Sequence, residues 1–266
     1  MQEGAQTYWA RNGNGNVVFF DTTHRTNRYC AKIGCFTTVG PNGDTIILAV
    51  YITMEETTEN FVWAFDQFRE CFKPPPAVLI TDGDPKMAAA KVAVFPASTK
   101  HHLCIYHLSL NFAEHIKKCF ADMKDYKVVL DAFWRLAKET DERTANDDSF
   151  NEEFDQIVSF VEVSGAAEKT VTDAVDWLNT KLRDRKEMWA ARYTWAYFTF
   201  GAHSTEVRGR RPGAGRGARA AANIAPHVAL VLTCSLRPIA RASSPTLVSS
   251  GLRPFTQRSS ASCMPT

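Results

Sequence analysis

The fold is decided by Val17-Val-Phe-Phe-Asp-Thr-Thr23, an apolar run that ends in a carboxylate. Continuous apolar character predicts a strand buried on both faces, and Asp21 stands where that strand leaves the core. A second run of this kind is Ala77-Val-Leu-Ile-Thr-Asp82, which again closes on an acid. We therefore expect two buried strands whose exits each carry an aspartate.

The sequence between these runs predicts two more strands and a helix. Residues 29–40 and 45–53 are rich in β-branched and aromatic residues and are joined by a Pro-Asn-Gly-Asp turn, so we expect an antiparallel meander. A helix follows, because four phenylalanines share one helical face: Phe61, Phe65, Phe68 and Phe72. Threonine and acid at 56–59 favour its start, and three prolines at 74–76 end it. The strand ending at Asp82 should then run parallel to an earlier strand through a crossover.

The remaining pattern divides the chain into segments. A helix at 85–95, a strand at 100–107 and a helix at 108–120 complete a mixed α/β core at 16–122, which follows a polar lead at 1–15. Residues 123–190 show helical spacing alone and predict an all-α insertion of roughly three helices. Aromatic character returns at 191–206, which we assign to the core and to the start of a further helix.

Composition sets the last segment apart. Of the whole chain, 45% is hydrophobic and 11% aromatic, which excludes a disordered protein. Residues 207–266 hold nine arginines and no lysine, aspartate or glutamate, so the first 206 residues carry 22 basic and 29 acidic groups. This Arg/Gly/Ala/Ser/Pro-rich tail is predicted to be disordered; alternatively it is translated out of frame or through an intron. A genuine basic tail would bind nucleic acid through phosphates.

Other functional classes are excluded by simple patterns. No run of about 18 apolar residues occurs, so no membrane span is predicted, and the polar start lacks the apolar core of a secretory signal. Seven scattered cysteines favour a reducing intracellular compartment over a disulfide framework.

The two strand-terminal acids suggest chemistry. Carboxylates at the ends of neighbouring strands can converge at one sheet edge and hold Mg²⁺, which prefers hard oxygen ligands. Two such ions would activate a nucleophile and stabilise the leaving oxygen of a phosphodiester, with a third acid completing the site. The alternative is that Asp21 and Asp82 only begin turns.

Four ordered motifs then resemble a known family. They are Phe20-Asp-Thr-Thr23 with Asn27 and Tyr29, the stretch from Glu56 to Phe65, Ile80-Thr-Asp-Gly-Asp84, and Cys104-Ile-Tyr-His107. Over roughly residues 15–206 the chain resembles the transposase domain of Mutator-like elements, including the plant far-red-impaired-response proteins derived from them. The resemblance implies an RNase H-like fold with a DDE triad and an α-helical insertion before the third acid, with Asp21 and Asp82 as the first two acids.

The same resemblance implies an activity and partners. We expect cleavage and transfer of DNA strands with Mg²⁺ or Mn²⁺, acting on transposon ends and target DNA, with homo-oligomers and a nuclear location. The alternative is a non-enzymatic DNA-binding or transcription-regulatory protein derived from such a transposase. The chain is then a transposase domain by family, and whether it is an enzyme depends on its third acid.

Other acids, and a cysteine and a histidine, are alternative candidates for site residues. Asp84 is the competitor for the second acid, but Asp82 stands at the strand end while Asp84-Pro85 suits a helix cap. Asp44 and Glu56 are expected to be turn and cap residues. Cys104 and His107 match the family's Cys-x-x-His element and could form one side of a zinc site, which normally takes four ligands. Otherwise Cys104 is a buried strand residue and His107 caps the next helix.

The third acid departs from the family pattern. That acid is expected in Thr-x-Arg-x-Glu, whereas this chain reads Thr205-Glu-Val-Arg-Gly-Arg210, with Gly209 in the place of the glutamate. Glu206 is the candidate third acid only if the local register shifts by about one helical turn. The triad is therefore Asp21, Asp82 and Glu206, or it is incomplete.

Overall fold

A computed structural model describes residues 3–12, 17–23, 29, 31–40, 43–139, 146–197 and 230–233. Its sheet has the strand order β5-β4-β1-β2-β3-β6. The antiparallel part consists of β1 (Val17–Thr23), β2 (Lys32–Val39) and β3 (Thr45–Thr53), and both β4 (Val78–Thr81) and β5 (Lys100–Leu103) run parallel to β1. The predicted mixed α/β class and the crossover before Asp82 are thus confirmed.

The outer strand β6 differs from the expectation for the tail. Residues Leu230–Thr233 pair in parallel with Ala49–Ile52 of β3. They read Leu-Val-Leu-Thr, a short β-favouring run that can use the open hydrogen-bonding edge of β3. This strand corrects the prediction of disorder for these four residues, while the rest of 207–266 lies outside the described residues.

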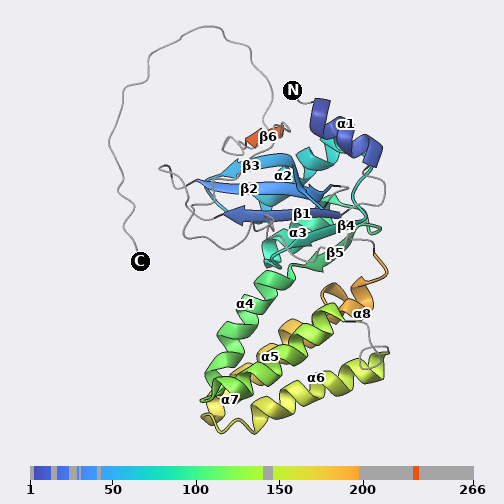
Figure 1. The fold of residues 1–266 in the computed structure, drawn as a ribbon. Coiled ribbons are helices and arrows are strands. Elements are labelled where there is room, and N and C mark those ends of the chain that lie inside the picture. The colour runs from blue at the N-terminus through green and yellow to red at the C-terminus, as the bar shows by residue number, and fades with distance from the viewer. Residues whose placement is uncertain are drawn as a thin grey trace, which may run out of the picture.

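One face of the sheet is covered by helices α1 (Glu3–Asn12), α2 (Thr58–Cys71) and α3 (Pro85–Val94) (Figure 1). The predicted phenylalanine face of α2 is buried, and the Phe36 ring stacks on Phe68 with centroids 4.4 Å apart. Phe20 of β1 meets the Phe65 ring edge to face at 5.1 Å. Helix α2 starts at the N-cap Thr57, whose side chain accepts from the Asn60 N–H.

Of the two acids predicted as a turn and a cap residue, only one has that role. Glu56 is not the cap of α2; its carboxylate pairs with Lys32, the first residue of β2. Asp44 is a turn residue as predicted, because its carbonyl oxygen accepts from the Gly40 N–H at 2.7 Å before β3 begins.

Helix α1 lies in the segment that the sequence suggested was a polar lead. Its Trp9 side chain is fully buried and donates its indole N–H to the Pro74 carbonyl oxygen at 2.9 Å. Trp9 also meets the Phe68 ring edge to face, with centroids 6.4 Å apart. Helix α1 thus buries Ala5 and Trp9 against the sheet cluster, and most of its other described side chains are exposed or only partly buried, which explains the polar composition of the segment.

The opposite face of the sheet has a smaller apolar cluster. Val17 and Phe19 of β1 point to this face, as do Val78 and Ile80 of β4, because side chains alternate along a strand. Cys104 is buried among them, and Tyr197 packs against the cluster at the point where the chain returns from the helices. Alternation therefore explains why the first run is apolar at every position: both faces are covered.

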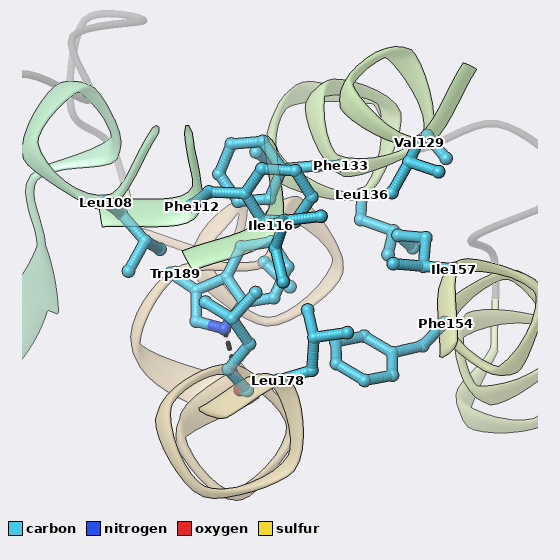
Figure 2. Packing of buried hydrophobic residues seen from close by; sticks show 14 of the residues in the cluster. Leu108, Phe112, Ile116, Val129, Phe133, Leu136, Phe154, Ile157, Leu178 and Trp189 are labelled. Carbon is cyan, nitrogen blue, oxygen red and sulfur yellow. Dashed lines mark hydrogen bonds between the residues drawn. The ribbon is translucent and has the colours of Figure 1, made fainter. Parts of the chain in front are cut away.

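The helical part extends away from the sheet along α4 (Ile105–Ile116) (Figure 1). It comprises α5 (Met123–Lys138), α6 (Asp147–Glu162), α7 (Glu168–Trp177), the π-helical turn η2 (Leu178–Leu182), the 3-10 segments η1 (Lys117–Cys119) and η3 (Arg183–Met188), and α8 (Ala191–Thr194). Figure 2 shows that α4 shares their core, with Phe112 stacked on Phe133 and Trp189 between the helices. The helical core thus begins within α4, whereas the sequence placed that helix with the sheet.

The boundary between β5 and α4 also differs from the prediction. The strand ends at Leu103, and the Cys104 N–H donates to the Thr81 carbonyl oxygen at 2.7 Å. Helix α4 begins at Ile105, so Cys104 is its N-cap residue and His107 lies inside its first turn. No helix within the described ranges is long and apolar enough to cross a membrane.

Candidate active site

The register of two parallel strands brings the first two predicted acids together. β1 pairs with β4 so that Val17 lies opposite Val78 and Phe19 opposite Ile80. Continuing this register by two residues places Asp21 level with Asp82. Asp21 comes two residues after Phe19 and Asp82 two residues after Ile80, and both of these apolar residues face the cluster around Cys104. Because side chains two apart share a face and neighbouring strands are about 5 Å apart, the two carboxylates are neighbours on that side of the sheet.

The turn after β4 holds Asp82 in place. Gly83 adopts a φ of +88°, and its N–H donates to the Thr81 hydroxyl oxygen at 3.2 Å. The Asp84 N–H donates to Asp82 Oδ1 at 2.9 Å, which fixes the orientation of that carboxylate. The turn therefore leaves Asp82 with a restricted rotamer and its second oxygen outside this hydrogen bond.

Asp84 has a separate structural role. Its side chain accepts from the Lys86 N–H at 2.6 Å, and it is the N-cap of α3 with Pro85 in the first turn. The sequence predicted this capping role for Asp84, the alternative candidate for the second acid. The geometry thus separates the strand-end carboxylate of Asp82 from the capping carboxylate of Asp84.

His107 supplies positive charge to the two acids. Burial raises the pKa of Asp82, the charges of Asp84 and Asp21 raise it further, and the Asp84 N–H and His107 oppose that rise. A hydrogen bond with the Cys104 side chain is the largest cause that raises the pKa of His107 to about 9, against the effect of its burial, and the charges of Cys104, Asp21 and Asp82 add to it. At neutral pH an imidazolium therefore lies beside two carboxylates.

Two cysteines border the same site. Cys35 of β2 lies directly opposite Asp21 in the antiparallel pair, and both burial and the Asp21 charge raise the pKa of its thiol. Cys104 is fully buried and linked to His107. Because both thiols are at least partly desolvated, they are poor candidates for exposed nucleophiles.

The side chains of the site can be compared with the ligand sets that zinc and magnesium usually take. Within the part of the chain that the structure describes, no three His, Cys, Asp or Glu side chains are grouped to share a metal ion. Zinc, with its usual four ligands, is therefore not matched by Cys104 and His107 together with their described neighbours. Mg²⁺ needs less, since it is commonly bound by one or two carboxylates with water and substrate phosphate, and Asp21 with Asp82 fits that requirement.

The third predicted acid cannot be placed in this geometry, because Glu206 lies outside the described residues. Tyr197 is the last residue described before it, and its ring lies edge to face with His102 of β5 at 5.3 Å. The chain thus re-enters the sheet beside β5, on the face that carries Cys104.

The structure adds one residue to the site that the sequence did not suggest. The guanidinium of Arg185 lies against Gly83, with Nη2 3.4 Å from the position that a Cβ atom would take there. In the sequence, Arg185 is one of several basic residues in a charged run, Lys181 to Lys186, with nothing to distinguish it.

Comparisons with known proteins agree with the motifs. Residues 17–111 match the family model described as the MULE transposase domain. This segment contains Asp21, Asp82, Cys104 and His107, and it ends within α4. The predicted resemblance to Mutator-like transposases is therefore confirmed for this segment, which holds strands β1–β5 and helices α2 and α3.

Similar proteins cover different lengths of the chain. Protein FAR1-RELATED SEQUENCE 5 of Arabidopsis thaliana is 35% identical over 106 residues, which are 40% of this chain and 12% of that protein. Protein FAR1-RELATED SEQUENCE 6 of the same plant is 25% identical over 126 residues, 47% of this chain and 17% of that protein. The PKS-NRPS hybrid synthetase cheA of Chaetomium globosum is 28% identical over 215 residues, 71% of this chain and 4% of that protein. The chain thus spans a small part of each of these relatives.

Proposed function

We propose that this chain is an RNase H-like transposase domain that cleaves and joins DNA strands with divalent metal ions. The observation that carries the proposal is the level placement of Asp21 and Asp82 on adjacent parallel strands, within a segment that matches the MULE transposase domain. The sheet order, with an antiparallel meander followed by two parallel strands, supports the RNase H-like assignment.

The residues of the site would have different roles in metal binding, orientation and charge balance. Asp21 and Asp82 would bind Mg²⁺ or Mn²⁺ through their carboxylate oxygens, with Glu206 as the candidate third acid. When bound, the ions polarise the phosphodiester and favour deprotonation of the attacking water or DNA 3′-hydroxyl. The hydrogen bond from the Asp84 N–H keeps Asp82 oriented, and His107 balances the charge of the acid pair. The apolar cluster beneath the acids would limit the access of water.

Ion binding tests this assignment most directly. We expect the full chain to bind Mn²⁺ in a calorimetric titration and the double variant Asp21→Asn/Asp82→Asn to lose that binding. Asp44→Asn is the matched control, because it removes one charge from a turn outside the site. Each single site variant should also reduce cleavage of a DNA duplex more than about 100-fold. Unchanged ion affinity in the double variant would contradict the proposal.

The second candidate is a non-enzymatic DNA-binding or regulatory protein, located like the first in the nucleus and able to form homo-oligomers. The observation in its favour is Gly209, which stands where the family pattern has its third acid. Ion-independent DNA binding without any cleavage by the full chain would favour this candidate. The acidic balance of the first 206 residues argues against strong binding by charge alone.

A further inference from the structure

The helical part of the chain delivers one cation to the edge of the sheet that carries the acids. Segment η3 packs against β5, and its helical geometry breaks at Arg185, which has φ −114° and ψ 17°. The break turns the guanidinium toward the β4–α3 turn, where Nη2 and Nη1 lie 3.4 and 3.8 Å from the Cβ position of Gly83. Glycine leaves room for this approach, so Arg185 lies directly beside the turn that orients Asp82.

Nearby cations of η3 and α8 contact carboxylates of α6. Arg183 pairs with Asp155. Lys186 Nζ lies 3.9 Å from an Asp147 carboxylate oxygen, and the Nε of Arg192 donates to the other oxygen at 2.9 Å. These three side chains share two carboxylates and link η3 and α8 to α6.

Arg185 is different. Across the described ranges it has no ion pair and no side-chain hydrogen bond, although its side chain is half-buried. Burial lowers the pKa of Arg185. The raised pKa of Asp82 has its own burial as the largest cause, and Arg185 is not among the charges that act on it, whereas Arg185 adds to the effect of burial in lowering the pKa of His101. A guanidinium stays charged even when partly desolvated. The Arg185 guanidinium therefore does not serve as the counter-ion of Asp82.

We propose that Arg185 binds a backbone phosphate of the DNA strand that enters the site, at the turn that follows Asp82. The planar fork of a guanidinium matches two phosphate oxygens, and partial burial strengthens such a bond. Partial desolvation of a cation costs stability unless an anion pairs with it; no described residue supplies that anion to Arg185, and a phosphate would. The helical insertion would thus position DNA as well as separate the second acid from the third. This inference rests on the proposed function, since it takes DNA as the substrate.

DNA binding at varied salt tests the inference. The full-length chain is titrated against a fluorescent DNA oligonucleotide in anisotropy measurements, with EDTA present so that metal ions do not contribute. Arg185→Gln is expected to weaken binding about 5- to 10-fold and to reduce the slope of log affinity against log salt by about 0.7–0.9, the value for one phosphate contact. Arg185→Lys should keep the slope and lose part of the affinity, because the charge remains without the fork.

The control is Arg183→Gln, which removes the same charge from the same segment but from a side chain that pairs with Asp155. It should leave the salt slope unchanged. If Arg185→Gln does not fold, which its thermal transition will show, Arg185→Met keeps the aliphatic stem and replaces it in the comparison.

The outcomes separate the two proposals. A reduced slope in Arg185→Gln alone supports the inference even if the wild-type chain cleaves no DNA, in which case the catalytic proposal fails by itself. An unchanged slope in Arg185→Gln, an equal reduction in Arg183→Gln, or a wild-type chain without salt-dependent DNA binding would each overturn the inference.

Discussion

Replacement of Gly83 by alanine should affect both the stability and the site of this protein. The residue has φ +88°, a left-handed conformation in which an L side chain is unfavourable by about 1–2 kcal/mol. The added methyl group would also lie 3.0 Å from Leu103 Cδ2 and 3.4 Å from Arg185 Nη2. Both are ends of flexible side chains, so we expect them to shift and add less than about 1 kcal/mol.

The two contributions can be separated by a control that the chain itself provides. Gly43 has φ +78°, and nothing lies within 4 Å of its Cβ position. Gly43→Ala should therefore show the backbone cost alone, about 1–2 kcal/mol in urea denaturation, whereas Gly83→Ala should exceed it modestly. Only Gly83→Ala should displace Arg185 and weaken DNA binding in the anisotropy assay.

The result that would refute this reasoning is equally specific. If Gly83→Ala were as stable as the wild type while Gly43→Ala was destabilised, the turn after β4 would not have the strained backbone assigned to it. If Gly83→Ala lost stability but bound DNA with unchanged affinity, the approach of Arg185 to the turn would have no role in binding.

Three further predictions concern stability. Burial lowers the pKa of His101 to about 4 in the folded chain. As the pH falls, His101 is therefore protonated in the unfolded chain before it is protonated in the folded chain, and the free energy of unfolding should fall between pH 6.5 and 4 by at most about 3 kcal/mol. His101→Gln should flatten that decline in urea titrations at several pH values; an unchanged slope contradicts it. Gly34→Ala should cost about 1–3 kcal/mol, because its methyl would lie 2.9 Å from the Phe20 ring; no loss of stability would contradict that close packing. Trp189→Ala should cost about 3–5 kcal/mol and reduce hydrogen-exchange protection in α5–α7 before the sheet; protection lost first in the sheet would contradict this.

Local signals explain what could be predicted about the fold. The phenylalanine face of α2 follows from helical periodicity, and the Asp84-Pro85 cap follows from the preferences of a single turn. The end of β4 was visible because its apolar run stops just before Asp82, whereas β1 continues two residues past Asp21, which the sequence had placed at the exit of that strand. All of these depend on residues within a few positions of one another.

Other features depend on partners that are distant in the chain. Helix α1 was missed because its burial depends on Trp9 reaching Pro74. The end of β5 was misplaced because helix α4 already begins at Ile105 and packs its apolar face in the helical core. The strand β6 was missed because its pairing needs the open edge of β3. Periodicity cannot report contacts that are made only after the chain has folded.

The sequence by itself determined that each of the two acids follows an apolar strand segment, since that depends on local composition. Only the tertiary structure decided that Asp21 and Asp82 share a register and a face, and that Arg185 alone among its charged neighbours reaches the turn at Gly83. The physical reason is that register and docking are fixed by hydrogen bonds and packing between segments far apart in the chain, where one residue of slip would turn a carboxylate to the opposite face of the sheet.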